Sequence, residues 1–370
     1  MEVPLLSFFT GGGLFDIGFK QAGFRVVWTN EIYEPFVDMY SHAMSGWLSS
    51  LNGHKAKAKI SNTTSIEDLS CTKVIREAFG SSRPKVFGVI GGPPCPDFSN
   101  GGRHAGGKGT NGRLTEVFAQ MICRLNLSFF VIENVAGLYR FQKHREFLKQ
   151  QVAYLRRRGG YAVDYKLLNA LELGVPQDRE RLFIVGFRKA LANRAVGRQL
   201  RKRETGWFPW PIVDAYVGAK ALPWPKTNKF GKTPNLPENC PVELTVYPAL
   251  FGNGNPEKIA NGRDVFTAHS KKFQLIREGD VAQMSFKRLH RFRYSPTAWY
   301  GHQEVHLHPT KPRRLSVREA LRIQTVPDEY VLPAGYSLSA KFKMICNGVP
   351  CLMAHHLAKA VGAFLLCATK

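Results

Sequence analysis

The sequence predicts an α/β fold, in which a doubly wound, Rossmann-like mixed sheet carries helices on both faces and is followed by a second, smaller and more irregular domain. Two observations predict the first part: short apolar, β-branched or aromatic runs alternate with helix-like segments, and a glycine cluster follows the first run. A third observation predicts the second part, because the stretch after residue 188 is rich in Pro, Gly, Asn and Trp and has no regular period.

Six runs in the first half are expected to form strands, and five segments between them are expected to form helices. The strands are 4–9, 25–29, 86–90, 129–133, 161–167 and 181–187, and the helices are 14–22, 34–43, 67–79, 115–125 and 143–158. A basic run that starts at Lys189 is interpreted as a linker into the second domain. Helical periodicity returns at 316–323 and 351–366, where an apolar face can dock back on the first domain.

The charge of the chain indicates a polyanionic partner. Lys and Arg number 52 against 28 Asp and Glu, which gives a formal net charge of +24 and a pI near 9.9. A surplus of this size suits nucleic acid. A membrane surface is the alternative, but no apolar stretch is expected to reach the ~18 to 20 residues that a spanning helix needs. We therefore expect nucleic acid as the partner and no membrane.

The N-terminal segment and the cysteines bear on the compartment and on metal binding. Residues 1–13 lack the basic and apolar regions of a secretory signal, so we expect the protein to remain in the cytoplasm. The seven cysteines are odd in number and scattered, which indicates reduced thiols. Cys351 and His355 share a helical spacing, and three histidines lie between 302 and 308, but neither group completes a ligand set, so no metal site is expected.

A glycine cluster follows the first predicted strand. The segment FFTGGG, residues 8–13, leads from a strand into a helix, where a doubly wound sheet lets its backbone approach a nucleotide-like ligand. Glu31 lies 20 residues after Gly11 at the end of the next strand, the position from which a carboxylate reaches ribose hydroxyls. A glycine turn that binds no ligand is the alternative.

Cys95 lies in the segment GGPPCPDFS, residues 91–99, directly after the strand predicted at 86–90. Reactive groups in doubly wound sheets lie at the carboxyl ends of strands. The glycine-rich continuation, residues 101–109, is typical of a flap that excludes water when it closes. The segment therefore predicts a reactive thiol, although a cysteine between prolines can also be inert.

Two further groups of polar residues lie at strand ends. Glu133 and Asn134 end one apolar strand, and QDRER at 177–181 precedes another. A carboxylic acid can donate to or protonate a ring nitrogen of a base, and a guanidinium group can bind a base carbonyl or a phosphate. Taken singly, each residue is also compatible with an ordinary surface or capping role.

Taken in order, these segments resemble those of the cytosine carbon-5 DNA methyltransferase family. The matching blocks are FFTGGGLFDIGF, NE, GGPPCPDFS, GRL, ENV, GVPQDRERLFIVGFR, RRLSVREALRIQTVPDEY and NGVP, which extend from residue 5 to about 360 around a variable stretch at 189–290. The family keeps its DNA-reading domain in that interval. The resemblance implies an S-adenosylmethionine-dependent enzyme with a catalytic and cofactor-binding domain at 1–188 plus 335–370 and a target-recognition domain at 189–334.

The resemblance also implies a role for each site residue. Catalysis would fall to Cys95 as the nucleophile, Glu133 as the partner of cytosine N3, Arg179 and Arg181 at the cytosine and its phosphate, and Asn134 behind the Pro94-Cys95 loop. The cofactor would contact Phe9, Thr10, Gly11, Gly13, Leu14, Glu31, Ile32, Asn62, Pro93, Asn347 and Val349, with Phe9 on the adenine and Glu31 on the ribose. Ser99, Arg103 and Gln177 would contact DNA.

Three positions depart from the family's pattern. Leu14 replaces a glycine found in many members, and Pro96 replaces the usual glutamine after the cysteine. The aspartate that usually binds the adenine amine has no clear counterpart, and the alignment places Asn62 there, whose carbonyl can accept a hydrogen bond from an amine. These departures bear on cofactor affinity and flap contacts rather than on the reaction.

The reaction that the resemblance implies is methylation of carbon 5 of a flipped-out cytosine in a specific duplex DNA sequence, after Cys95 adds to carbon 6. An RNA cytosine methyltransferase is the competing enzyme, since one group of the family acts on transfer RNA; the long variable stretch and the flap favour duplex DNA. A catalytically silent DNA-binding module would keep the fold without the reaction, and a nicotinamide dehydrogenase would share only the glycine turn and Glu31. We expect a monomer, beside which a separate restriction endonuclease can act.

Overall fold

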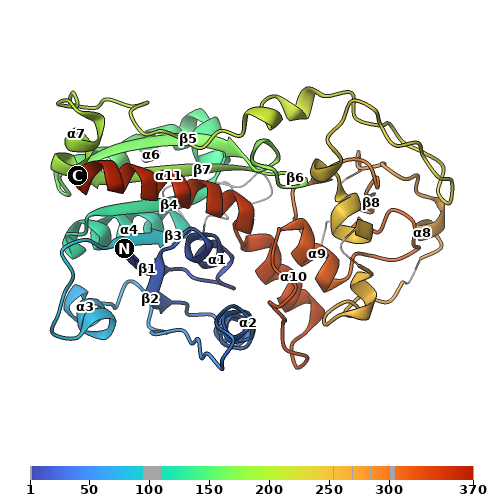
Figure 1. The fold of residues 1–370 in the computed structure, drawn as a ribbon, viewed down its shortest axis with the longest axis horizontal. Coiled ribbons are helices and arrows are strands. Elements are labelled where there is room, and N and C mark those ends of the chain that lie inside the picture. Colours follow the sequence, from blue (N-terminus) through green and yellow to red (C-terminus); the bar gives the residue numbers. More distant parts are fainter. Residues whose placement is uncertain are drawn as a thin grey trace.

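The computed structural model describes residues 2–94, 110–252, 254–268, 270–283, 285–300 and 305–369. Its centre is a six-stranded sheet with the strand order β2-β1-β3-β4-β7-β5 (Figure 1). The strands are β1 (Pro4–Phe8), β2 (Arg25–Asn30), β3 (Gly88–Gly91), β4 (Phe129–Val135), β5 (Tyr161–Asn169) and β7 (Glu180–Arg188). Because β7 runs antiparallel to β4 and β5 whereas the other neighbours are parallel, the predicted mixed sheet is confirmed.

Helices cover both faces of this sheet, and successive strand residues alternate between the two apolar cores that result. On one face lie α1 (Leu14–Gln21), α7 (Lys189–Val196) and α11 (Cys351–Thr369), and α11 crosses the front of the sheet in Figure 1. On the other face lie α3 (Cys71–Phe79), α4 (Thr110–Leu125) and α6 (Gln142–Arg157). In β4, for example, Val131 enters the first core and Ile132 the second. The doubly wound arrangement follows from this alternation.

A third apolar core lies beside the sheet. It joins α1 to α2 (Glu34–Asn52), α9 (Val317–Ile323) and α10 (Leu338–Asn347). α2 is longer than the predicted 34–43 and ends at Gly53, which has a positive φ of 67°. α10 lies outside the predicted helices; it begins after Ser337, whose hydroxyl accepts a hydrogen bond from the backbone N–H of Ala340.

The segment that begins at Lys189 is a helix, α7, so the prediction of a linker there is wrong. Its Ala192 is buried, and the chain that follows adds Trp207 and Phe208 to the core around Phe187 and Phe364. The basic run begins in this helix with Lys189 and Arg194, both exposed, and continues beyond its end at Val196. The packing of the first core nevertheless continues past that residue, to about Trp210.

The rest of the second half is irregular, as predicted. Between 211 and 310 its described elements are short: β8 (Lys287–Arg288), β9 (Ser295–Pro296), β10 (His306–Leu307), α8 (Lys272–Leu275) and several helices of three to five residues between Asp214 and Lys258. The first half also contains short elements, namely α5 (Gly137–Arg140) after β4, a single-turn helix at Leu171–Leu173, and β6 (Gln177–Asp178) before β7. β6, which directly precedes β7 in the chain, pairs with β9, so backbone hydrogen bonds join the segment before β7 to the second half of the chain. This part lies to the right of the sheet in Figure 1.

One segment is long and apolar enough to cross a membrane by length and composition, contrary to the prediction that none would be. It spans Leu338–Thr369, which comprises α10 and α11, with a mean hydropathy of 1.5. Half of the most apolar window is buried, and α11 packs against α1 and α7 over the sheet. Those contacts are the ones expected of a core helix in a folded domain.

Candidate functional site

Most of the site residues predicted from the sequence meet at one edge of the sheet. β1, β2, β3 and β4 are parallel and end at this edge, and the antiparallel β7 begins there. The chain leaves β1 for β2 on one side and reaches β3 on the other, so the strand order reverses between β1 and β3. Open α/β sheets bind ligands at such a reversal, outside the carboxyl ends of the strands.

The glycine turn after β1 has an unusual backbone. Phe9, Gly11 and Gly13 all have positive φ, of 53°, 56° and 73°. A Cβ on Gly13 would lie 2.6 Å from the ring of Tyr40, so only glycine fits there. A Cβ on Gly11 would meet nothing within 4 Å. The turn therefore leaves open space on its outer side, which suits a ligand that approaches the backbone.

Glu31 is positioned at this turn from the end of β2. Its Oε2 accepts a hydrogen bond of 2.9 Å from the backbone N–H of Gly11, and its Oε1 accepts one of 2.8 Å from that of Tyr33. Ile32, directly after it, is 61% exposed, which is unusual for isoleucine. Thr10 links the turn to β2, since its hydroxyl accepts from the N–H of Asn30. The Glu31 carboxylate suits the hydroxyls of a ribose, the exposed Ile32 side chain suits an apolar base, and the open backbone at Gly11 leaves room for both.

The C-terminal half contributes to the same rim. Asn347 is exposed at the end of α10, and the ammonium group of Lys343, one turn earlier, lies 4.7 Å from the centre of the Tyr33 ring. The lysine therefore connects the last turn of α10 to the segment that follows Glu31.

Three of the expected cofactor contacts are buried. Val349 follows α10, and Pro93 follows β3. Leu14 is only 1% exposed, because its side chain packs against Gly348. A glycine at 348 is required for this contact, so the side chain of Leu14 packs inside the protein. A contact of Leu14 with the cofactor stays a prediction.

Most polar atoms of the Asn62 side chain are engaged within the protein, and its expected contact with an adenine amine stays a prediction. Its Nδ2 donates to both carboxylate oxygens of Glu77, at 3.0 and 2.9 Å, and its Oδ1 accepts from the backbone N–H of Thr64 at 2.8 Å. Glu77 also accepts from the indole N–H of Trp28. The side chain of Asn62 is thus engaged within the protein, where it holds α3 to the end of β2.

Glu133 and Arg181 form the charged centre of the site. Arg181 Nε lies 2.9 Å from Glu133 Oε1, and both side chains are largely buried. Gly92, at the start of the segment that leads to Cys95, lies so close that a Cβ there would be 2.9 Å from Glu133 Oε2. Burial raises the pKa of Glu133 above its usual range, although Arg181 and Arg179 oppose the shift.

Asn134 and Arg179 are buried behind this pair. Asn134 Oδ1 accepts from the N–H of Val135, and its Nδ2 has no partner among the described residues. Arg179 donates to the backbone carbonyls of Cys346 and Gly348, at 2.8 and 3.0 Å, on either side of Asn347. Burial and the nearby Arg181 lower its pKa to about 9. Arg179 thus anchors the Asn347 loop through Nη2, whereas its Nε has no partner among the described residues, and its expected contact with the cytosine stays a prediction.

Three expected DNA contacts have different outcomes. Gln177 is fully buried, because its Oε1 accepts from the N–H of Ala298 and its Nε2 donates to Gln324. It therefore does not face a DNA strand. Ser99 and Arg103 lie outside the described residues, as does Cys95.

Two residues of the site region were missed by the sequence analysis. Asp16 is 2% exposed under the glycine turn, where its Oδ1 accepts from the hydroxyl of Ser7 at 2.7 Å. The sequence feature that could have indicated this buried carboxylate is its position between apolar residues in the block FFTGGGLFDIGF. Tyr330, fully buried, donates from its hydroxyl to the carbonyl of Gly12 at 2.5 Å. No local signal could reveal that contact, since the two residues are 318 positions apart.

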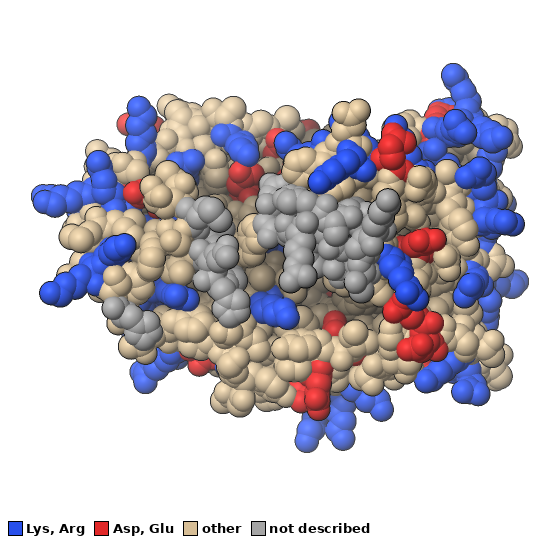
Figure 2. Space-filling view, turned by 180° about the vertical axis from the view of Figure 1, so that it is seen from behind, with Lys and Arg blue, Asp and Glu red and all other residues tan. Residues whose placement is uncertain are grey.

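The surface charge follows the composition. Lys and Arg side chains line the rim of the face in Figure 2 and outnumber Asp and Glu there. Within the described ranges, no group of three or more His, Cys, Asp or Glu side chains could hold a metal ion.

Comparison with known proteins shows the family to which the chain is similar. The chain matches the family C-5 cytosine-specific DNA methylase over residues 3–363. It is 40% identical to the Type II methyltransferase M.NmeDI of Neisseria meningitidis serogroup C, over 98% of this chain and 84% of the relative. It is 30% identical to M.FnuDI of Fusobacterium nucleatum, over 97% and 94% of the two chains. A prophage-encoded putative DNA modification methyltransferase from E. coli shares the fold, with a TM-score of 0.63, 20% identity, and 99% and 100% of the chains covered.

Proposed function

Because the chain belongs to the family of C-5 cytosine-specific DNA methylases, we propose that it transfers a methyl group to carbon 5 of a flipped-out cytosine in a specific duplex DNA sequence, through a covalent bond between Cys95 and carbon 6. The observation that carries this proposal is the ion pair of Glu133 and Arg181 at the end of β4, with the backbone of Gly92 against the carboxylate. The chain continues from Gly92 through two prolines to Cys95, which limits how far the thiol can lie from this pair.

S-adenosylmethionine would supply the methyl group, and the glycine turn is its expected site. Glu31 would accept from the ribose hydroxyls with the lone pairs that Gly11 and Tyr33 leave free, because each carboxylate oxygen can accept more than one hydrogen bond. Phe9 and the exposed Ile32 would contact the adenine, and Asn347 would contact the cofactor from α10. Open space at Gly11 supports this assignment.

Cys95 would act first. Carbon 5 of cytosine is too weakly nucleophilic for direct methylation, so a thiolate adds to carbon 6 and pushes electron density toward carbon 5 and N3. Glu133 would donate a proton to N3, which neutralises the charge that develops on the ring. Burial, which raises the pKa of Glu133, favours its protonated form in this step. Carbon 5 would then attack the methyl group of S-adenosylmethionine, and the sulfur–methyl bond would break to leave S-adenosylhomocysteine. Transfer of the carbon-5 proton to solvent would restore the 5,6 double bond and expel the Cys95 thiolate, while N3 would return its proton to Glu133.

Arg181 would have two tasks in this scheme. Its Nε bonds to Glu133, which fixes the carboxyl group in place, and its remaining N–H groups can donate to the cytosine carbonyl. Its Nη1 also donates to the backbone carbonyl of Glu180, so the guanidinium plane is held on two sides. An orientation fixed in this way suits stabilisation of a developing negative charge.

Duplex DNA would bind across the basic surface, with the irregular second half as the target-recognition domain. The base must leave the helix before Cys95 can reach it, at a cost of a few kcal/mol that phosphate contacts would offset. The domain division of 1–188 plus 335–370 and 189–334 stays a proposal, modified by the packing of 189–210 on the first core. The protein would act as a monomer in the cytoplasm, and a separate restriction endonuclease would be its companion.

The test is methyl transfer from tritiated S-adenosylmethionine to duplex DNA and to transfer RNA in parallel, followed by bisulfite sequencing of DNA from cells that express the protein. We expect label in DNA and a fixed sequence around each protected cytosine. Label confined to transfer RNA would favour the RNA enzyme, and no label in either substrate would favour a silent DNA-binding module.

A further inference from the structure

The direction of the Gly12 carbonyl is not fixed by the local sequence, because Gly11, Gly12 and Gly13 can adopt many backbone dihedral angles. Gly11 and Gly13, on either side, have positive φ values that glycine alone adopts easily, and many other combinations are open to them. A single described hydrogen bond holds that carbonyl, from the hydroxyl of Tyr330 at 2.5 Å. Since Tyr330 is fully buried, water does not compete for the bond.

The backbone at Tyr330 is itself held by Arg318 of α9. Arg318 Nη2 donates to the carbonyl of Tyr330 at 3.0 Å, Nη1 donates to that of Pro327 at 3.2 Å, and Nε donates to that of Ala260 at 3.0 Å. Arg318 is 0% exposed. One side chain therefore ties the segment 327–330 to the turn at 260, which belongs to the second half of the chain.

Asn261 adds a second connection to the same turn. Its Oδ1 accepts from the backbone N–H of Leu332 at 2.7 Å, and its Nδ2 donates to the carbonyl of Leu332 at 2.8 Å. Asn261 has a φ of 64°, and the nearby Asp264 pairs with the buried Lys341 of α10 at 2.6 Å. The turn 260–264 thus contacts both the Tyr330 segment and the helix that ends at Asn347.

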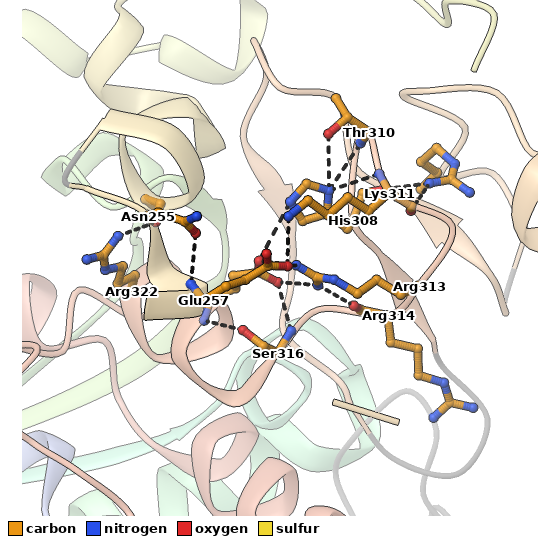
Figure 3. Close-up of polar contacts among 12 residues, drawn as sticks. Asn255, Glu257, His308, Thr310, Lys311, Arg313, Arg314, Ser316 and Arg322 are labelled. Atoms are coloured by element: carbon orange, nitrogen blue, oxygen red, sulfur yellow. Dashed lines mark hydrogen bonds and ion pairs between the residues drawn. The ribbon is translucent and has the colours of Figure 1, made fainter. Parts of the chain in front are cut away.

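The N-terminus of α9 is fixed within the second half by the polar network in Figure 3. Arg313 bonds to Glu319 of α9 at 2.7 Å and to Glu257 at 2.8 Å, and Lys311 also pairs with Glu257. Ser316 and Glu319 form a capping box at the start of α9. The position of Arg318, and through it that of Tyr330, is accordingly set by residues of the second half.

We propose that Tyr330 is a positioning residue for the cofactor turn, and that it transmits the position of the second half of the chain to the carbonyl of Gly12. The proposal rests on the proposed function, in which that turn binds S-adenosylmethionine. Met344 of α10 supports it from the other side, because a Cβ on Gly12 would lie 2.7 Å from its sulfur, so the turn is confined between Tyr330 and α10.

The test replaces Tyr330 by phenylalanine, which removes the hydroxyl and keeps the ring. We expect the affinity for S-adenosylhomocysteine, measured by calorimetry without DNA, to fall roughly 3- to 10-fold, the worth of one buried hydrogen bond. In steady-state assays KM for S-adenosylmethionine should rise by a similar factor while kcat changes little, because the lost interaction is made in the ground state and the transition state alike.

Tyr336→Phe is the matched control. Its hydroxyl donates to Asp38, on the exposed side of the same segment, and not to the cofactor turn. We expect this variant to bind S-adenosylhomocysteine like the unaltered protein. Equal binding by Tyr330→Phe and Tyr336→Phe would overturn the proposal. If the unaltered protein itself does not bind S-adenosylhomocysteine, the proposed function fails instead, so the two failures are distinguishable.

The link to the second half is tested with Asn261→Gly, since glycine keeps the positive φ and removes both bonds to Leu332. We expect this variant, whose folding is checked by thermal unfolding, to weaken S-adenosylhomocysteine binding about 2- to 5-fold. In a Tyr330→Phe background the same change should have little further effect, because both act through one contact. Fully additive losses, or unchanged affinity in the single variant, would show that the second half does not act through Tyr330.

Discussion

Glu133 and Arg181 form an ion pair between neighbouring antiparallel strands, with Arg181 Nε 2.9 Å from Glu133 Oε1. Both groups are largely removed from water, so neither charge is solvated without the other. Burial nevertheless raises the pKa of Glu133, which means that its proton is bound more tightly than in an exposed carboxyl. A carboxyl group in this state, held in place by Arg181, can donate to a ring nitrogen.

Glu133→Gln should therefore lower the rate of methyl transfer by about 10²-fold or more, because the amide cannot transfer a proton. The variant should also be less stable, because the glutamine carbonyl can still accept from Arg181 but leaves the largely buried guanidinium charge uncompensated. Rates are therefore compared at a temperature at which thermal unfolding shows both proteins to be folded. The rate with labelled S-adenosylmethionine and excess DNA measures the first effect. Glu180→Gln, at a partly exposed neighbouring carboxylate that pairs with Arg140, is the control and should retain the activity. Equal rates for Glu133→Gln and the unaltered enzyme would remove Glu133 from the mechanism.

Glu31→Ala should weaken cofactor binding and leave DNA binding largely intact. The lost hydrogen bonds to a charged acceptor are worth ~1.5 to 3 kcal/mol, or about 10- to 150-fold in affinity. The variant also frees the N–H groups of Gly11 and Tyr33, which the carboxylate now holds. Calorimetry with S-adenosylhomocysteine and gel shift with DNA separate the two effects. An unchanged affinity for S-adenosylhomocysteine would disprove the ribose assignment.

The sheet and the positions of Glu133 and Arg181 at neighbouring strand ends could be predicted from the sequence because their signals are local. Each strand is a short apolar run, and Glu133 and Arg181 lie at the ends of two such runs. α7 was missed because its basic residues resemble a solvated linker, whereas its buried Ala192 gives little signal alone.

The partners of buried polar groups could not be predicted, because they lie far away in sequence. Arg179 reaches carbonyls 167 and 169 residues away. Asn62 is engaged by Glu77, a residue of the helix α3. Motif position therefore predicted which residues lie at this edge of the sheet, but only the fold reveals which side chains are engaged by distant parts of the chain.

Asp16 should make the stability of the fold depend on pH. Burial raises its pKa to about 7, against which the hydrogen bond from Ser7 acts, and its Oδ2 has no partner among the described residues. The folded state thus binds the proton more tightly than the unfolded state. The resulting stabilisation is fully present below the unfolded pKa of 3.8 and is lost as the pH rises through about 7.

Asp16→Asn should abolish this dependence. The free energy of unfolding, measured with urea between about pH 5 and 8, should fall with rising pH more steeply in the unaltered protein than in the variant. Asp68→Asn, at an exposed position, serves as the control and should keep the original slope. Parallel pH profiles for Asp16→Asn and the unaltered protein would contradict the buried-carboxyl interpretation.

Arg179 and Arg181 should respond differently to replacement by lysine. Arg179→Lys should lower the free energy of unfolding by about 2 to 4 kcal/mol, because an ammonium group cannot bond the carbonyls of Cys346 and Gly348 with the same geometry and leaves buried acceptors unpaired. Arg181→Lys should cost less stability but reduce the methyl-transfer rate about 10²-fold. Urea unfolding and initial rates on both variants test this; the reverse ranking would contradict the structural role of Arg179.

The covalent step gives the last prediction, that Cys95 and no other cysteine bonds to carbon 6 of the target cytosine. It rests on the segment GGPPCPDFS after β3, on the approach of Gly92 to Glu133, and on the need for a thiolate at carbon 6. With 5-fluorocytosine at the target position, the methylated adduct cannot lose a proton from carbon 5. The complex should therefore survive denaturing electrophoresis when S-adenosylmethionine is present.

Cys95→Ser should abolish that band, because a serine hydroxyl is far less ionised than a thiol at neutral pH and no adjacent base is assigned to activate it. Cys346→Ser is the matched control, since Cys346 adjoins Asn347 at the same site and its burial raises the pKa of its thiol, which makes it a poor nucleophile. This control should form the adduct normally. If Cys95→Ser still forms the adduct, or if mass spectrometry finds the bond on another residue, the proposed mechanism is wrong even in an enzyme that methylates DNA.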